Sequence, residues 1–103
     1  MSTTTDLTSR LDAVKASTAE ALRTTEADRD ASVVTVAVVR EFDTKADKSR
    51  HPGNDAPRDS VIELEQAGDS AKAAAEADPG LGSVAREAVL AAHLAICILK
   101  TEV

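Results

Sequence analysis

The sequence offers one closely spaced pair of reactive side chains, His93 and Cys97. They are four residues apart, so they share one face if the segment is helical, and such a spacing can place two ligands on one metal ion. A complete site needs about two more ligands, and the only other histidine, His51, is distant in the sequence. A cysteine nucleophile with a histidine base would also need an oxyanion hole. We therefore expect both residues to be packing residues, with no metal or cofactor.

Two further motifs have a simpler structural interpretation. Gly80-Leu81-Gly82-Ser83 opens a helix, where free amides can bind anions, but no Gly-Lys-Ser/Thr follows and no strand precedes it. We interpret this segment as a helix–helix connection. Glu63 and Glu65 are two residues apart and point to different helix faces, so they are not a paired acid and base. The sequence therefore predicts that the chain is not an enzyme.

The only local concentration of basic residues lies near the middle of the chain. The candidate basic patch consists of Arg40, Lys45, Lys48 and Arg50, with acidic residues interleaved. The whole chain carries a net charge of −6, with one Phe and neither Trp nor Tyr. Nucleic-acid binding relies on basic side chains for phosphates and on rings for base stacking. A solvated helix end is the simpler interpretation, and nucleic acid is left open as a partner.

The composition limits how large a core one copy can build. The 103 residues suffice for one domain, but twenty are alanine and only 22 are Leu, Ile, Val or Phe. Large apolar side chains supply most of the free energy of burial, about 1.5–3 kcal/mol each. A single copy would therefore be marginal, and burial against a second copy or an obligate protein partner is expected.

Helical periodicity begins near the N-terminus. We expect residues 1–5 to be a disordered tail and residues 6–48 to form one long helix or two helices, since Asp28 and Asp30 could cap a second one. Leu7, Leu11 and Val14 start a seam of alternating four- and three-residue spacings. Residues 31–39 are rich in valine, as strands are. However, no second strand-like run could pair with them, and Val34, Val38 and Phe42 also follow helical spacing. We favour a helix there, with a strand paired across a dimer as the alternative.

The second half of the chain predicts a helical hairpin. Residues 49–57 contain two prolines and a glycine and form a loop, and residues 58–103 form the hairpin, which turns near Pro79. The last helix is apolar nearly all round, because Leu90, Leu94 and Ile98 lie opposite its other apolar face. Such a helix should be central and buried on all sides. We see no internal repeat.

Together these observations predict an all-α fold of three or four helices in a small oligomeric bundle. The candidate interface combines the first seam with the opposite face of the last helix: Leu7, Leu11, Val14, Leu90, Leu94 and Ile98. The N-terminus has no basic and apolar leader, and the longest apolar stretch, residues 88–99, is shorter than the about 20 residues that span a bilayer. We expect a cytoplasmic protein without a membrane partner.

Residues 28–43 carry a resemblance to a known family. Asp28-Arg29-Asp30 followed by VVTVAVVREFD is similar to a stretch of the small terminase subunits of phages that infect actinobacteria. The resemblance implies a helical, ring-forming protein that hands phage DNA to the packaging motor. The chain departs from that family in being acidic and in having no basic N-terminal arm and no helix-turn-helix.

We therefore predict a non-catalytic self-assembly protein, most concretely a phage or prophage assembly component. The alternative is an acidic inhibitor that covers the basic surface of a nuclease or regulator with Glu63, Glu65, Asp69 and Glu76.

Overall fold

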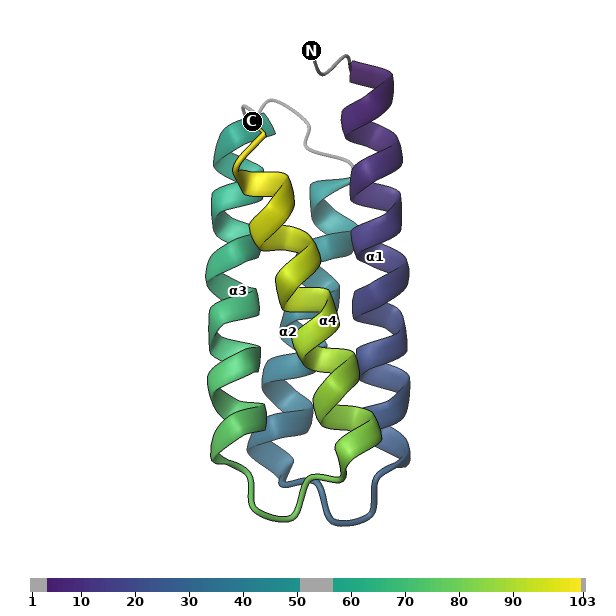
Figure 1. Cartoon of the computed structure of the whole chain (residues 1–103), viewed down its shortest axis with the longest axis vertical. Helices are drawn as coiled ribbons and strands as arrows, with labels where there is room; N and C mark the ends of the chain where they lie inside the picture. The colour runs from purple at the N-terminus through teal and green to yellow at the C-terminus, as the bar shows by residue number, and fades with distance from the viewer. Residues whose placement is uncertain (1–3, 51–56, 103) are drawn as a thin grey trace.

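The protein is a bundle of antiparallel helices (Figure 1). The structure is a computed structural model and describes residues 4–50 and 57–102. Within these ranges it has four helices and no strand. The helices are α1 (Thr4–Ala27), α2 (Val33–Ser49), α3 (Pro57–Ala77) and α4 (Ser83–Lys100). They run alternately up and down along a molecule 41 Å in length. The all-α prediction is confirmed, with four helices rather than three.

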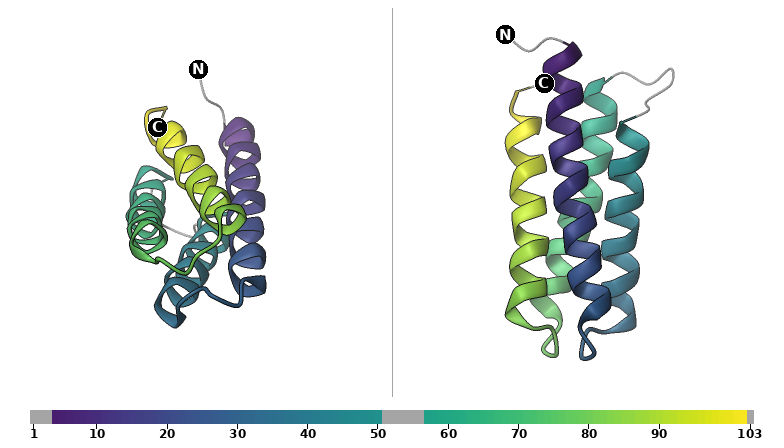
Figure 2. Two further views of the ribbon diagram at one scale, coloured as in Figure 1. Left: turned by 60° about the horizontal axis from the view of Figure 1, so that its bottom comes forward. Right: turned by 90° about the vertical axis from the view of Figure 1, so that its right-hand side faces the viewer.

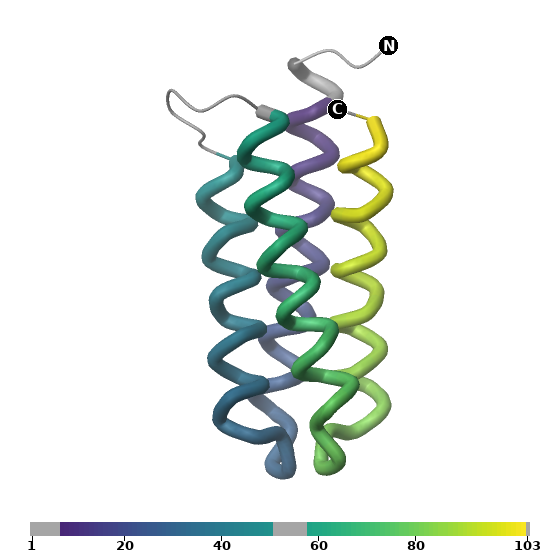
Figure 3. The backbone as a smooth tube through the Cα atoms, turned by 90° about the vertical axis from the view of Figure 1, so that its left-hand side faces the viewer, coloured from purple at the N-terminus to yellow at the C-terminus, as the bar shows by residue number. Residues whose placement is uncertain are grey.

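Each helix packs against two neighbours and keeps an outer face. α1 contacts α2 and α4, and α3 contacts the same two helices from the other side (Figures 2 and 3). The α1–α2 and α3–α4 loops lie at one end of the bundle, opposite the chain termini. The expectation of a central last helix is therefore wrong. α4 has the same number of helix neighbours as the others, so part of its apolar circumference stays exposed.

Several boundaries differ from those expected. Residues 6–48 form two helices, which is one of the two expected possibilities, but α1 already begins at Thr4, inside the expected tail. The expected loop 49–57 is shorter at both ends, since Ser49 still belongs to α2 and Pro57 opens α3. The rest of that loop, residues 51–56, lies outside the described residues, as do residues 1–3.

The valine-rich segment is helical. The Ser32 hydroxyl accepts the backbone N–H of Thr35 at 3.1 Å and so caps the first turn of α2. Inside the helix, burial recurs at Thr35, Val39, Phe42 and Ala46, which is helical spacing. The helical prediction is thereby confirmed over the strand alternative. A capped first turn and one buried stripe outweigh the β preference of the valines.

The fold is a repeat of two helical hairpins, which the sequence did not reveal. Position n in α1–α2 corresponds to position n + 50 in α3–α4, and within the described ranges ten pairs of equivalent positions are buried in both halves. Sequence identity is sparse, with Glu26-Ala27-Asp28 matched by Glu76-Ala77-Asp78 as the longest run. The pairs of buried positions are Leu11/Val61, Val14/Leu64, Thr18/Gly68, Ala21/Ala71, Thr25/Ala75, Thr35/Ala85, Val39/Val89, Phe42/Ala92, Ala46/Ile96 and Ser49/Leu99.

The two loops hold each other through reciprocal hydrogen bonds. Asp28 Oδ2 accepts the backbone N–H of Gly82 at 2.7 Å, and Asp78 Oδ2 accepts that of Ser32 at 2.8 Å. Each carboxylate also accepts the N–H two residues further along its own loop. Asp78 additionally accepts the Thr35 hydroxyl at 2.8 Å. The Ser32 N–H, followed by the Thr35 hydroxyl, lowers the pKa of the Asp78 carboxyl. Each aspartate thus satisfies an orphan amide at the start of the other hairpin's second helix.

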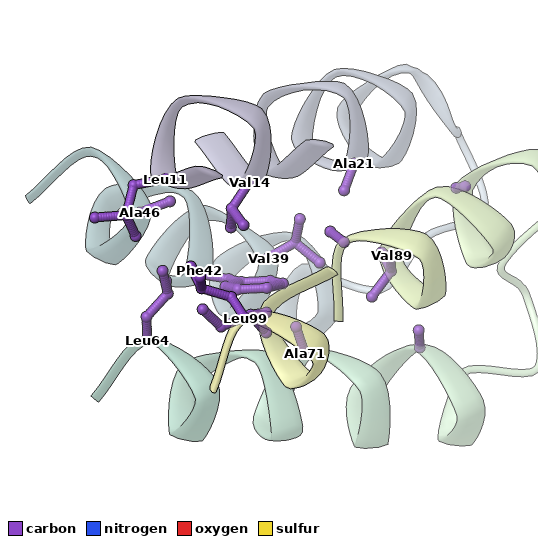
Figure 4. Close-up of a cluster of buried hydrophobic side chains, with 14 of the residues drawn as sticks. Leu11, Val14, Ala21, Val39, Phe42, Ala46, Leu64, Ala71, Val89 and Leu99 are labelled. Carbon is purple, nitrogen blue, oxygen red and sulfur yellow. The ribbon is translucent and has the colours of Figure 1, made fainter. Parts of the chain in front are cut away.

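Side-chain size is complementary between the two halves of the core, in which Phe42 lies among side chains of the other helices (Figure 4). Phe42 and Ile96 are fully buried, whereas their equivalents, Ala92 and Ala46, are small. The Phe42 ring packs against Gly68, where an added Cβ would lie 3.0 Å from Phe42 Cζ and 3.3 Å from Ile96 Cγ2. Gly68 is therefore required by the close approach of these two side chains.

Candidate functional site

The outer face of α4 carries an exposed apolar stripe. Val84, Leu94 and Ile98 are 71%, 59% and 48% exposed, and Ala91 is exposed between them. Positions 84, 91 and 98 are seven residues apart, and position 94 lies between the last two, which is the spacing of a helix–helix seam. We call these four residues the α4 stripe. Nothing in the described chain covers it.

The repeat supplies an internal reference for this surface. α2 occupies the same place in its own hairpin as α4, so its outer face shows what the fold itself requires there. On α2 the equivalent positions are exposed and mostly polar or charged. The equivalent pairs for the α4 stripe are Val84/Val34, Ala91/Glu41, Leu94/Thr44 and Ile98/Lys48, with the α4 residue first. Val84 has an exposed valine as its equivalent, whereas the apolar surface at Ala91, Leu94 and Ile98 is specific to α4 and is not a consequence of the bundle.

A shallow groove lies beside the α4 stripe. It runs between α1 and α4, has a volume of about 250 Å³, and is lined by Ala16, Ser17, Glu20, Ala88 and Ala91. Its floor is built mostly of small residues, so a side chain from another helix could enter it. The stripe and the groove together form one surface that has protruding apolar side chains and a groove that could accept such a side chain.

The six candidate interface residues fall into two groups, because those on α1 pack into the core and two of those on α4 are exposed. Leu11 and Val14 are 7% and 3% exposed and belong to the core, and Leu7 packs against that core while partly buried. The seam of α1 is thus covered by its own bundle and cannot meet a second copy in this fold. On α4, Leu90 is partly buried, whereas Leu94 and Ile98 are exposed.

The candidate basic patch is largely neutralised by ion pairs. Arg40, Lys45 and Arg50 each contact a carboxylate from another helix, and Lys48 is exposed. The nitrogen–oxygen distances are 2.8 Å for Arg40–Glu26, 3.2 Å for Lys45–Glu63 and 2.6 Å for Arg50–Asp12. These pairs leave little positive field for phosphate groups.

The candidate acidic surface on α3 is also paired. Each of its four carboxylates contacts a basic side chain or an imidazole of this chain. The distances are 3.2 Å for Glu63–Lys45, 2.9 Å for Glu65–Lys100, 2.7 Å for Asp69–His93 and 2.9 Å for Glu76–Lys72. A basic partner would have to compete with these contacts, so the α3 surface is less acidic than its sequence indicates.

The pair His93 and Cys97 gains a third member, Asp69 of α3. Asp69 Oδ1 lies 2.7 Å from His93 Nε2, and Cys97 Sγ lies 3.4 Å from the same nitrogen. In a catalytic triad the carboxylate holds the nitrogen opposite the one facing the nucleophile, which is not the case here. Desolvation, followed by the carboxylates of Glu65 and Asp69, also raises the pKa of the Cys97 thiol. The geometry does not assemble a nucleophile with its base.

Asp69 could not be identified from residue spacing along one helix, because it lies on α3 and the other two residues lie on α4. A signal was nevertheless present. In an antiparallel hairpin, residues at similar distances on either side of the turn face each other, and Asp69 and His93 flank the turn at Pro79 in this way.

Comparison with known proteins identifies no family for this chain. No protein-family model, curated protein or solved structure matches it. In the described part of the chain, none of the helices combines the length and apolar character needed to cross a membrane. Function is therefore inferred from the exposed surface and the side-chain geometry of the bundle.

Proposed function

We propose that this chain is a non-catalytic helical protein that self-associates, and that the α4 stripe is the contact surface between copies. The observation that carries the proposal is the contrast between equivalent positions. Leu94 and Ile98 are exposed on α4, where α2 has Thr44 and Lys48. Burial of an exposed Leu or Ile is favourable, and an exposed apolar seam at heptad spacing is typical of a surface that packs against another helix.

A second copy fits this surface in an antiparallel arrangement. If a two-fold axis passes near Ala91, Leu94 meets Ala88 of the partner copy and Ile98 meets Val84 of the partner copy. The small side chain at position 91 allows the helices to approach closely, and the alanine-lined groove receives Leu94. Such a contact is self-complementary, as a two-fold interface requires.

The more specific proposal is a phage or prophage assembly component resembling a small terminase subunit. It is supported by the resemblance of residues 28–43 and by the helical fold. A ring would need the α4 stripe to contact a different surface of the neighbour. The exposed Val33 and Val34 at the start of α2 offer such a surface, since they are 85% and 66% exposed.

The acidic inhibitor is retained as the alternative, although no contact in the bundle favours it. It makes the opposite prediction about the free protein, since it needs no contact between copies.

The first test is the absolute mass in solution, measured by light scattering at several concentrations. Detection should use refractive index, because the chain has neither Trp nor Tyr. A single oligomer that persists on dilution supports self-association. A mass of two chains fits the two-fold contact, and a larger single mass fits a ring. A folded monomer at all concentrations would overturn the proposal and move the search to a basic protein partner.

A further inference from the structure

Three metal-ligating side chains from two helices converge at the α3–α4 contact. The donor atoms are Asp69 Oδ1 on α3 and His93 Nε2 and Cys97 Sγ on α4, and all lie within 4.8 Å of one another. His93 and Cys97 are part-buried, whereas Asp69 is exposed. The cluster is therefore held by the bundle on one side and open to solvent on the other.

We propose that Asp69, His93 and Cys97 form a site for a divalent transition-metal ion of the zinc class, with water at the fourth coordination position. Zn²⁺ accepts thiolate, imidazole and carboxylate ligands together, usually in a tetrahedral arrangement. Three protein ligands with one position left open form a recognised class of zinc site. The sequence predicted no metal site, because Asp69 was not identified as a third ligand. This proposal replaces that expectation.

The present contacts do not satisfy the three groups equally. His93 Nε2 carries at most one hydrogen, so if it donates to Asp69 at 2.7 Å it cannot accept from the Cys97 thiol at 3.4 Å, and the thiol is left with the longer contact to His93 Nδ1 at 3.9 Å. A metal ion at this point would take the place of the shared hydrogen and bind all three donors. Asp69 and His93 would have to separate to about 3.3 Å, the ligand–ligand spacing in tetrahedral zinc. The exposed Asp69 side chain has room for this movement.

The charges around the cluster are compatible with a bound cation. Glu65 lies one helical turn before Asp69 and pairs with Lys100 at 2.9 Å, so the positive charge of Lys100 is already neutralised. Lys72, on the other side of Asp69, pairs with Glu76 at 2.9 Å. Asp69 and a Cys97 thiolate would supply two negative charges to a divalent ion. Because the ligands come from α3 and α4, binding would also tie these helices together and stabilise the bundle.

The test is a titration of the chelator-treated, reduced full chain with Co²⁺, a spectroscopic substitute for Zn²⁺. Thiolate-to-metal charge-transfer absorption is easy to detect because the chain has neither Trp nor Tyr. We expect saturation at one equivalent per chain, displacement of Co²⁺ by Zn²⁺, and a Tm that rises with the Zn²⁺ concentration.

Ligand variants identify the site. Cys97→Ser should abolish the charge-transfer band, and Asp69→Asn and His93→Gln should weaken binding, whereas His51→Gln should leave it unchanged. Circular dichroism confirms that each variant is folded. The proposal is overturned if the wild-type chain shows no band, or if Asp69→Asn and His93→Gln bind Co²⁺ as tightly as the wild type. It does not depend on self-association, because all three ligands come from one chain, and the Leu94→Ala/Ile98→Ala variant should bind Co²⁺ normally.

Discussion

Replacing Leu94 and Ile98 together by alanine removes the two largest apolar side chains of the proposed interface. The expected result is loss of self-association with a smaller loss of monomer stability. Both side chains are about half exposed, so truncation should cost the monomer only about 1 kcal/mol per side chain. Alanine is also the best helix former, so α4 should remain intact.

The size of the effect follows from the exposure of the two side chains. Complete burial of a Leu or Ile is worth about 1.5–3 kcal/mol. Leu94 is 59% and Ile98 48% exposed, so each has about 1 kcal/mol left to gain from burial by a second copy. A two-fold contact uses both side chains from both copies. The double variant should therefore lose about 4 kcal/mol of association free energy, which raises Kd about a thousandfold.

The assay is the oligomer mass as a function of concentration, by light scattering or sedimentation. The matched control is Thr44→Ala/Lys48→Ala, which changes the equivalent positions of α2 and should leave Kd unchanged. If the wild-type chain associates and the α4 variant associates equally well, the interface lies elsewhere. If both double variants weaken association to the same extent, the contrast between α2 and α4 has no functional meaning.

Two further predictions concern the stability of the fold, measured by urea unfolding followed by circular dichroism. Gly68→Ala should destabilise by about 1 kcal/mol, because overpacking of about 2 kcal/mol outweighs a gain in helix propensity of about 1 kcal/mol. In a Phe42→Leu background the same change should instead stabilise, and stabilisation in both backgrounds would refute the steric argument. Asp78→Asn should destabilise more than Asp28→Asn, since Asp78 also accepts the Thr35 hydroxyl. The lowered pKa of Asp78 means that its stabilisation is present above about pH 4 and is lost as pH falls through the folded-state value. The wild-type urea midpoint should therefore fall more between pH 6 and pH 3 than that of Asp78→Asn, and equal falls would argue against this role.

The repeat was not recognised in the sequence because the two halves share a pattern of buried positions and share few identical residues. Phe42 corresponds to Ala92 and Ala46 to Ile96, so large and small residues exchange places between the two halves. The core requires that the paired side-chain volumes together fill the available space. It does not require the same residue at both equivalent positions. The loop aspartates, Asp28 and Asp78, were the visible trace of the repeat, but their reciprocal contacts join residues far apart in the chain.

The sequence by itself determined that the chain is helical and that helices end before Pro52 and Pro79. Proline, glycine and the capping residues are local signals, and alanine-rich segments have a high intrinsic helix propensity. The sequence could not determine which face of α4 is buried, since α4 is apolar on nearly all sides and its periodicity selects no face. Only the tertiary structure decided this, because the positions of α1 and α3 leave Leu94 and Ile98 outside. The same packing brings Asp69 to His93 and Cys97, since contacts across a hairpin depend on the register of two helices and not on spacing along one.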